Sequence, residues 1–219
     1  MALSRLNLPN SITVARIFAC PALFLLILSP RILHLFVAFG LFLAAALTDL
    51  WDGYLARKHG LITDTGKLLD PIADKLLLVT TFVPFYIVSQ RPDPEWAVPW
   101  WGALPLWVVL VILGRELLVT VFRSWAARRG SVLSAGPSGK IKAFTQNIFS
   151  GSLILWYALV RVAGESGWTG GGAWRLWSAF HGGVTALTLG AALILTVFSM
   201  AVYYWENRGL LHGGHRAAT

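Results

Sequence analysis

Long apolar stretches separated by short polar segments make up most of the chain. A membrane-spanning helix needs about 20 mostly apolar residues, and six stretches meet that length. The pattern therefore predicts an all-α integral membrane protein with six transmembrane helices. The predicted spans cover residues 11–28, 32–58, 66–89, 97–128, 141–162 and 174–205.

The two ends of the chain have a different pattern. Residues 1–10 mix leucine with Arg5 and two asparagines, which predicts a short interfacial helix that ends at Pro9. Asn10 or Ser11 would then cap the first span. Residues 206–219 are polar and contain glycine and histidine, which predicts a flexible cytoplasmic tail. No segment has the composition of a separate soluble domain, so residues 1–219 are expected to form a single membrane domain.

The composition is typical of a membrane protein and limits the kinds of partner that it can bind. The chain is 56% hydrophobic and 13% charged, and its formal net charge is +8. The basic residues mark the ends of the apolar stretches and do not gather in a solvated patch. This distribution favours an anionic membrane surface and phosphorylated substrates over nucleic acid. The single cysteine, Cys20, excludes an intrachain disulfide.

The tryptophans and histidines are interpreted as structural residues and not as ligand-binding ones. Seven tryptophans near the predicted span ends are typical of an interfacial aromatic belt. The histidines show no metal-ligand spacing and are interpreted as surface or tail residues. The residues concerned are Trp96, Trp100, Trp101, Trp168, Trp174, Trp177 and Trp205, and His59, His181, His212 and His215.

Four aspartates lie where the second predicted span ends and the third begins. Asp49 and Asp52 form one pair, and Asp70 and Asp74 form the other. Spacings of three and four residues place the members of each pair on one helix face. An antiparallel hairpin would bring both pairs to the same side of the membrane, where four carboxylates repel unless a cation lies between them. Oxygen ligands favour a hard divalent ion such as Mg²⁺ or Mn²⁺.

Small residues and one arginine lie between the two pairs. Gly53, Ala56 and Gly66 allow close approach of a ligand or a helix, and Arg57 is a fixed cation suited to a phosphate. A structural interpretation stands beside this one. Aspartates at span ends also serve as caps and ion-pair partners, and glycine in a membrane helix commonly serves helix packing.

The spacing D-x-x-D-G-x-x-A-R-x8-G-x-x-x-D-x-x-x-D resembles the signature of the CDP-alcohol phosphatidyltransferase family. That family has six transmembrane helices, with the signature across the second and third. The resemblance implies transfer of a phosphatidyl group from a CDP-linked lipid to an alcohol, release of CMP, and a homodimer. The signature positions are Asp49, Asp52, Gly53, Ala56, Arg57, Gly66, Asp70 and Asp74.

The resemblance also implies roles for these residues. In a two-metal scheme, Asp49, Asp52 and Asp70 would be metal ligands. Asp74 would take the proton of the acceptor hydroxyl and could also contact a metal. The residues expected to surround the CDP-lipid are Thr48, Gly53, Ala56, Arg57 and Gly66.

Three further stretches resemble phosphatidylglycerophosphate synthases within this family. They are residues 7–16 (NLPNSITVAR), 68–78 (LLDPIADKLLL) and 114–142. The first two also resemble cardiolipin-type relatives. The third adds more cations than the diphosphate of CDP-diacylglycerol needs, so a phosphorylated acceptor, glycerol 3-phosphate, is expected. The candidate acceptor-phosphate ligands are Arg115, Arg123, Lys140 and Lys142.

Helix geometry ranks these four cations. Arg115 and Arg123 are eight residues apart, which is about 12 Å along a helix axis with a turn of about 80°. Both cannot hold one phosphate, so Arg123 and Lys140 are preferred. An ion pair between Arg115 and Glu116 is the alternative for Arg115.

The distribution of basic residues predicts the orientation. Most of them fall on the aspartate side of the six predicted spans, which places the aspartates and both termini in the cytoplasm, at the inner membrane. The other side holds Arg31, Arg91, Arg161 and Arg175.

Other functions remain open at this stage. The same chemistry could serve phosphatidylglycerol, inositol phosphate, serine or choline as acceptor. A divalent-cation transporter would instead place acids near mid-bilayer in broken helices. A catalytically silent membrane scaffold is the third alternative.

Overall fold

The computed structural model describes residues 8–59, 64–128 and 137–211. Some side chains near the gaps, including those of residues 52–59, lie outside its described part. Within these ranges the chain is helical and contains no β-strand, as predicted. The elements are α1 (Leu8–Leu28), α2 (Ile32–His59), α3 (Asp64–Ser89), η1 (Pro94–Trp96), α4 (Leu106–Arg128), α5 (Pro137–Ser166), η2 (Trp168–Gly170) and α6 (Gly172–Leu211).

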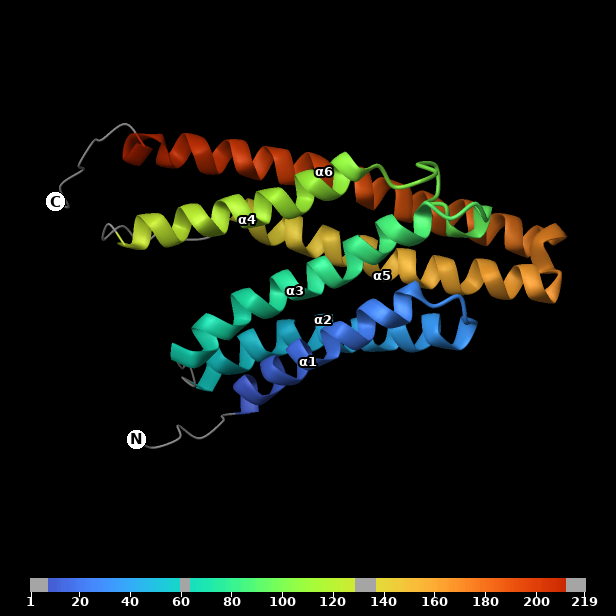
Figure 1. The fold of residues 1–219 in the computed structure, drawn as a ribbon, viewed down its shortest axis with the longest axis horizontal. Helices are drawn as coiled ribbons and strands as arrows, with labels where there is room; N and C mark the ends of the chain where they lie inside the picture. Colours follow the sequence, from blue (N-terminus) through green and yellow to red (C-terminus); the bar gives the residue numbers. More distant parts are fainter. Residues whose placement is uncertain (1–7, 60–63, 129–136, 212–219) are drawn as a thin grey trace.

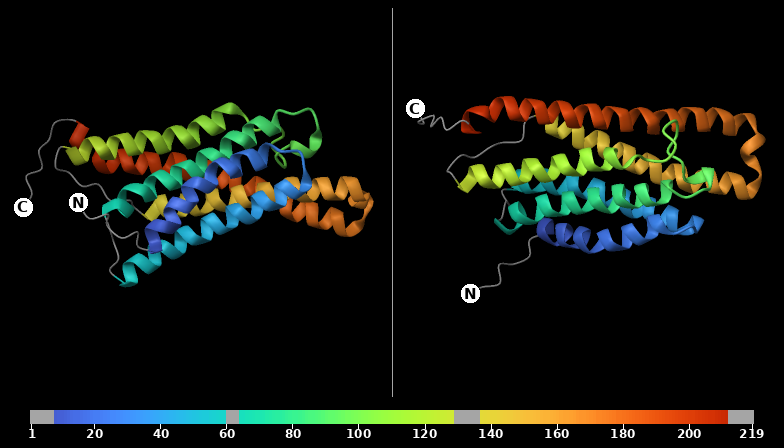
Figure 2. Two further views of the ribbon diagram at one scale, coloured as in Figure 1. Left: turned by 60° about the horizontal axis from the view of Figure 1, so that its bottom comes forward. Right: turned by 45° about the horizontal axis from the view of Figure 1, so that its top comes forward.

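The six long helices run side by side along one axis of the molecule (Figure 1). α1, α2 and α3 form one side, α4 and α6 form the other, and α5 lies between them, as further views confirm (Figure 2). α5 packs against α6 and α2, and α1 packs against α3 and α2. The end at which α2 ends and α3 begins is called the aspartate end below. α1 and α5 begin there, and α4 and α6 end there.

A chain of aromatic rings fills the centre of the bundle between α3 and α5. The Phe82 ring lies 5.4 Å from that of Phe149, and the Phe85 ring lies 5.9 Å from Phe149 and 6.2 Å from Tyr157. Tyr157 then meets Trp96 of η1 at 5.3 Å. Edge-to-face ring pairs of this kind add to the free energy gained from burial. These rings therefore join the second half of α3 to the middle of α5.

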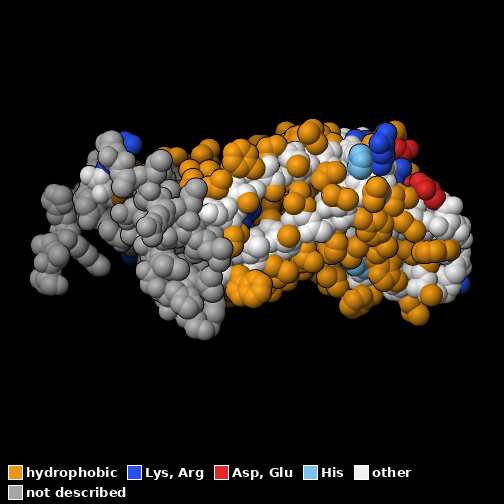
Figure 3. Space-filling view, turned by 90° about the horizontal axis from the view of Figure 1, so that it is seen from below, with side chains coloured by type: hydrophobic (Ala, Val, Ile, Leu, Met, Phe, Trp, Pro, Cys, Tyr) orange, Lys and Arg blue, Asp and Glu red, His pale blue; other side chains and the backbone are white. Residues whose placement is uncertain are grey.

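The surface is that of a membrane protein. Apolar side chains cover the middle of the face shown in Figure 3, and charged side chains gather toward its right-hand end. α1, α2, α3, α5 and α6 each contain a segment long and apolar enough to cross a bilayer. α4 does not meet that test, because Arg115, Glu116 and Arg123 interrupt it. The chain is thus an all-α integral membrane protein with five candidate spans in its described part.

The fourth predicted span is wrong in its first third. α4 begins at Leu106, and the residues before it form a compact turn in which Val98 N donates to Gly102 O at 2.8 Å. Pro99 and Pro105 lack the backbone N–H that a helix needs, and Gly102 has a φ of +70°. Ser89 Oγ ties this turn to α3 by accepting from Leu104 N at 2.9 Å.

Both ends of the described chain are more helical than predicted. α1 begins at Leu8, so Pro9 lies in the first turn, where its missing N–H costs nothing. Asn10 is consequently a buried helix residue and not a cap. The tail expected from residue 206 is helical as far as Leu211. The rest of that tail and residues 1–7 of the expected interfacial helix lie outside the described residues.

Two residues assigned to the surface lie inside the bundle. Trp96 is 1% exposed, and the guanidinium carbons of Arg91 and Arg161 lie 4.6 and 5.1 Å from its ring centroid. His181 is half-buried, and its Nε2 donates to Ser152 O at 2.9 Å. Trp100, Trp168 and Trp205 are exposed, as residues of an interfacial belt would be.

Candidate active site

The predicted helical hairpin brings three of the four aspartates to one end of the bundle. Asp49 lies near the end of α2, and Asp70 and Asp74 lie near the start of α3. Asp49 is half-buried, and the other two are more exposed. The fourth, Asp52, is on the last turns of α2, and its side chain lies outside the described part. Asp49 lies ten residues before the end of α2 and Asp74 lies ten residues after the start of α3, so these two carboxylates are set back from the helix ends.

α1 contacts all three described aspartates. Arg16 Nη1 donates to Asp49 Oδ1 and lies 3.5 Å from Asp74 Oδ1, so one guanidinium nitrogen contacts carboxylates from two helices. Thr13 Oγ1 donates to Asp70 Oδ1 at 3.0 Å. The Arg16 side chain is only 2% exposed. Its charge is permanent and lies within the group of carboxylates, which it partly neutralises.

A cavity of about 270 Å³ opens beside these carboxylates. Asp49 of α2 and Asp74 of α3 line it together with cations from α4 and α5. The cavity thus places acidic and basic groups from four helices around one space. Its charged lining residues are Asp49, Asp74, Lys75, Arg115, Glu116, Arg123, Lys140 and Lys142.

Two of the four predicted acceptor cations already have a carboxylate partner. Glu116 Oε1 accepts a hydrogen bond from Lys142 Nζ and lies 3.1 Å from Arg115 Nη1. Arg115 also donates from Nη2 to Ser199 Oγ at 3.1 Å. The ion pair between Arg115 and Glu116 was the alternative interpretation of Arg115, and the structure confirms that the pair forms. These two cations are therefore held in place by α4 itself and by α6.

The other two cations lack a described acidic partner. Neither Arg123 nor Lys140 forms an ion pair with a carboxylate in the described part of the chain. The guanidinium carbon of Arg123 lies 5.5 Å from the Tyr203 ring centroid, and no described acceptor reaches Arg123 Nε. Lys140 is exposed at the start of α5. Both line the cavity, so both are available to an anionic ligand.

An apolar groove of about 550 Å³ runs beside the cavity, between α2 and α5. The two spaces share Asp49, Lys140 and several apolar residues. From there the groove extends along the bundle to Gly151, Ser152 and Leu155. A ligand with a charged head and a hydrocarbon chain would match this pair of spaces.

The residues expected to surround the CDP-lipid are only partly described. Thr48 is not among the cavity residues, because its Oγ1 donates to Ala44 O at 2.7 Å and so faces its own helix. Gly66 is buried in the first turn of α3. Gly53, Ala56 and Arg57 belong to the last part of α2, where only the backbone is described.

Three residues that the structure brings to this site are not among the predicted site residues. Thr13, Arg16 and Lys75 contact the aspartates or line the cavity. A signal was present for the first two. A polar residue every third position in an otherwise apolar helix marks one polar face, and Thr13 and Arg16 share that face with Asn10.

The described aspartates can be compared with the ligands that a divalent ion needs. Among the side chains that the structure describes, no three His, Cys, Asp or Glu residues are grouped closely enough to hold a metal. Asp49 and Asp74 come together on Arg16, and their donors are carboxylate oxygens from two helices. Hard oxygen donors of this kind fit Mg²⁺ or Mn²⁺. Asp52, which would complete the set, lies outside the described side chains.

Comparison with known proteins agrees with this site. The family described as CDP-alcohol phosphatidyltransferase matches residues 6–198. A CDP-diacylglycerol–glycerol-3-phosphate 3-phosphatidyltransferase of Bacillus subtilis (strain 168) is 38% identical over 162 residues, which cover 68% of this chain and 77% of the relative. An enzyme of the same name from Rickettsia bellii is 36% identical over 149 residues, or 68% of this chain and 75% of the relative.

A third relative carries a different name. A cardiolipin synthase (CMP-forming) of Oryza sativa subsp. japonica is 35% identical over 150 residues, which cover 64% of this chain and 43% of the relative. The first two relatives are named as phosphatidyltransferases, and the third is named as a synthase that forms CMP. Because the family matches most of the length of this chain, the chain belongs to the CDP-alcohol phosphatidyltransferase family.

Proposed function

We propose that this protein transfers a phosphatidyl group from CDP-diacylglycerol to glycerol 3-phosphate, giving phosphatidylglycerophosphate and CMP. One observation carries the proposal: Asp49 and Asp74 line the same cavity as Arg123 and Lys140, beside an apolar groove. The carboxylates can bind a metal ion and accept a proton, the cations can bind a phosphate, and the groove can hold an acyl chain. The names of the bacterial relatives support the same reaction.

The aspartates are proposed as the site of one or two divalent ions, Mg²⁺ or Mn²⁺. Asp49, Asp52, Asp70 and Asp74 are the residues that would hold them, and the gathering of the three described ones at one end supports this assignment. A bound divalent ion would offset the charge of the diphosphate and stabilise the entering and leaving oxygens.

Asp74 is proposed as the general base. It is the exposed member of the pair held by Arg16, and it lines the cavity that an acceptor would enter. The 1-hydroxyl oxygen of glycerol 3-phosphate attacks the lipid-side phosphorus, and its proton passes to an Asp74 carboxylate oxygen. The bond from that phosphorus to the bridging oxygen breaks, and CMP leaves with the electron pair.

Arg123 and Lys140 are proposed to hold the phosphate of the acceptor. They come from α4 and α5 and line one cavity, and neither is engaged by a described carboxylate. Arginine and phosphate form strong, charge-assisted hydrogen bonds. Arg115 and Lys142 add positive charge to the same wall while Glu116 fixes their positions.

The lipid substrate is proposed to enter from the side of the bundle. Its acyl chain would occupy the groove between α2 and α5, whose lining is mainly apolar. Thr48, Gly53, Ala56, Arg57 and Gly66 remain the proposed neighbours of the cytidine diphosphate, on the signature alone. This arrangement keeps hydrocarbon in the bilayer and gives a soluble acceptor access to the cavity from water.

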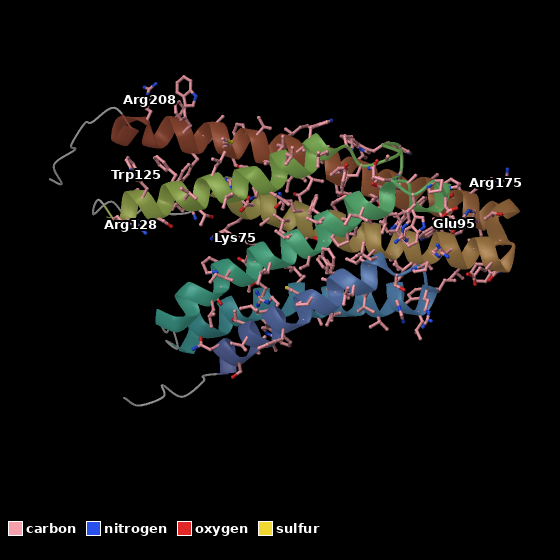
Figure 4. The ribbon with its side chains drawn as sticks, in the orientation of Figure 1. Lys75, Glu95, Trp125, Arg128, Arg175 and Arg208 are labelled. Carbon is pink, nitrogen blue, oxygen red and sulfur yellow. The ribbon has the colours of Figure 1, made fainter. Side chains whose placement is uncertain are left out.

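The membrane arrangement is part of the proposal. α4 runs beside the other helices (Figure 1), and its charged residues line the cavity, so we propose that it is the sixth span. Arg128 and Arg208 lie at the aspartate end, whereas Glu95 and Arg175 lie at the opposite end (Figure 4). An excess of basic residues at the aspartate end supports a cytoplasmic active site in the inner membrane. A homodimer is proposed on family resemblance.

Phosphatidylglycerol is the second candidate acceptor, because one relative is named a cardiolipin synthase. A panel of acceptors separates the candidates. Purified protein in detergent receives CDP-diacylglycerol with glycerol 3-phosphate, phosphatidylglycerol, inositol phosphate, serine or choline, with and without Mg²⁺ or Mn²⁺. Glycerol 3-phosphate is expected to give the product. An inert glycerol 3-phosphate beside a reactive phosphatidylglycerol would reverse the assignment.

The same assay in sealed vesicles tests the transporter alternative. That alternative predicts acids in broken helices, whereas α2 and α3 are continuous helices through Asp49, Asp70 and Asp74, which argues against a cation pathway. Divalent-ion flux without release of CMP would favour the transporter.

A further inference from the structure

One face of α1 carries three buried polar side chains in an otherwise apolar helix. Asn10, Thr13 and Arg16 are 7%, 1% and 4% exposed and lie at intervals of three residues. Such spacing places them along one side of the helix. Burying polar groups costs free energy unless they find partners. The face is turned toward α2 and α3, against which α1 packs.

The described partners of this face are the aspartates. Thr13 Oγ1 donates to Asp70 Oδ1 at 3.0 Å. Arg16 Nη1 donates to Asp49 Oδ1 and lies 3.5 Å from Asp74 Oδ1. α1 thus contacts one oxygen of each of the three carboxylates. One oxygen is thereby anchored, which limits the rotation of the carboxylate and fixes the direction of the other.

We propose that Thr13 and Arg16 are positioning residues of the aspartate site, and that α1 is its third wall. The proposal rests on the proposed function, since it assumes that the aspartates bind a divalent ion. One guanidinium nitrogen of Arg16 contacts carboxylates from α2 and α3, and Thr13 holds the Asp70 carboxylate one turn away. Substitution of residues that orient metal ligands in this way commonly weakens metal affinity 10- to 100-fold.

If only charge mattered, loss of Arg16 would raise the affinity for a divalent ion and not lower it. Arg16 is a cation, so its loss would strengthen the attraction between the remaining carboxylates and a divalent ion. Its loss also frees Asp49 and Asp74 to repel each other and separate. Thr13 resolves the ambiguity because it is uncharged. Thr13→Val keeps the shape of the side chain and removes the hydroxyl that donates to Asp70.

The test is the affinity for Mn²⁺, measured by electron paramagnetic resonance of free Mn²⁺ with purified, metal-stripped protein. Arg16→Gln is expected to bind Mn²⁺ at least about 10-fold more weakly. Arg16→Lys keeps the charge but loses the planar fork, so an intermediate affinity is expected. Thr13→Val is expected to bind Mn²⁺ several-fold more weakly. Thr13→Ser is expected to bind it within about twofold of the unaltered protein, because serine keeps the hydroxyl.

Arg161→Gln is the matched control. Arg161 is a largely buried arginine on α5 that pairs with Glu95 at 3.5 Å at the opposite end of the bundle. Its loss is expected to lower Tm while leaving Mn²⁺ affinity unchanged. This control separates positioning of the aspartates from a general loss of packing.

The outcomes distinguish the two proposals. Unchanged Mn²⁺ binding by Thr13→Val and Arg16→Gln, or tighter binding by Arg16→Gln, overturns the positioning role while the metal site stands. Absence of Mn²⁺ binding by the unaltered protein overturns the metal site and this role with it. Should Arg16→Gln fail to fold, the Thr13→Val and Thr13→Ser pair decides the question alone.

Discussion

Lys142 on α5 donates a hydrogen bond to Glu116 on α4, and the pair joins two helices at the wall of the cavity. Glu116 also pairs with Arg115, so this carboxylate lies between two cations. Lys142→Met would remove one cation and leave the carboxylate short of a partner. We expect a loss of about 1–3 kcal/mol of stability. A clear drop in Tm in detergent would confirm it, and an unchanged Tm would show that the pair is not structural.

Arg123→Gln is expected to behave differently, since Arg123 has no described carboxylate partner. It should raise KM for glycerol 3-phosphate about 10- to 100-fold, the value of one charge-assisted hydrogen bond, with little change in Tm. Arg128→Gln, on the exposed end of the same helix, is the matched control and should leave KM unchanged. An equal KM for both variants would remove Arg123 from the acceptor site.

Asp74→Asn keeps the size of the side chain but cannot take a proton. Turnover is expected to fall about 10²- to 10⁴-fold, while binding of CDP-diacylglycerol, followed by thermal stabilisation, largely remains. Asp93→Asn is the control, because Asp93 is an exposed residue at the opposite end whose side chain makes no capping hydrogen bond. Near-normal turnover in Asp74→Asn would assign the base elsewhere.

Gly151 lies at the far end of the apolar groove, where an added Cβ would meet the Phe42 ring at 3.2 Å. Gly151→Leu should therefore shorten the groove. We expect a loss of kcat/KM with long-chain CDP-diacylglycerol that is much smaller with a dioctanoyl analogue. Gly40→Leu, on α2 with open space around the added Cβ, is the control. Equal losses with both lipids would mean that the groove does not hold the chain.

Trp96 is a core residue at the opposite end, in contact with Arg91, Arg161 and Tyr157. Trp96→Ala should cost about 3–5 kcal/mol of stability, as large-to-small changes in a core do. Trp100→Ala removes a side chain that is 74% exposed and should cost far less in detergent. Tm values of the two variants, together with KM for glycerol 3-phosphate, test this. A shift in KM for Trp96→Ala would contradict a purely structural role.

The sequence predicted the helical hairpin and the gathering of the aspartates because both depend on local spacing. Asp70 and Asp74 fall on one helix face at any tertiary arrangement. In the structure α1 contacts both of them as well as Asp49, through Thr13 and Arg16.

Contacts between distant segments were harder to predict. Arg16 lies close enough to the start of its span either to snorkel to the membrane surface or to face a cavity, and its contact with Asp49 depends on how α1 packs against α2. Trp96 resembles a belt residue in its position near a span end, but the loop before α4 folds inward and buries it. In both cases the partner lies more than thirty residues away in the chain, so spacing alone gives no information about it.

The most direct test of the proposed reaction is its stoichiometry in metal-stripped, purified protein supplied with CDP-diacylglycerol. The reaction is followed as CMP released and phosphatidylglycerophosphate formed, before and after Mg²⁺ or Mn²⁺ is restored. The account predicts that both products appear in equal amounts, and only when the divalent ion and glycerol 3-phosphate are both present. Release of CMP without glycerol 3-phosphate, or full turnover in the metal-stripped protein, would contradict it.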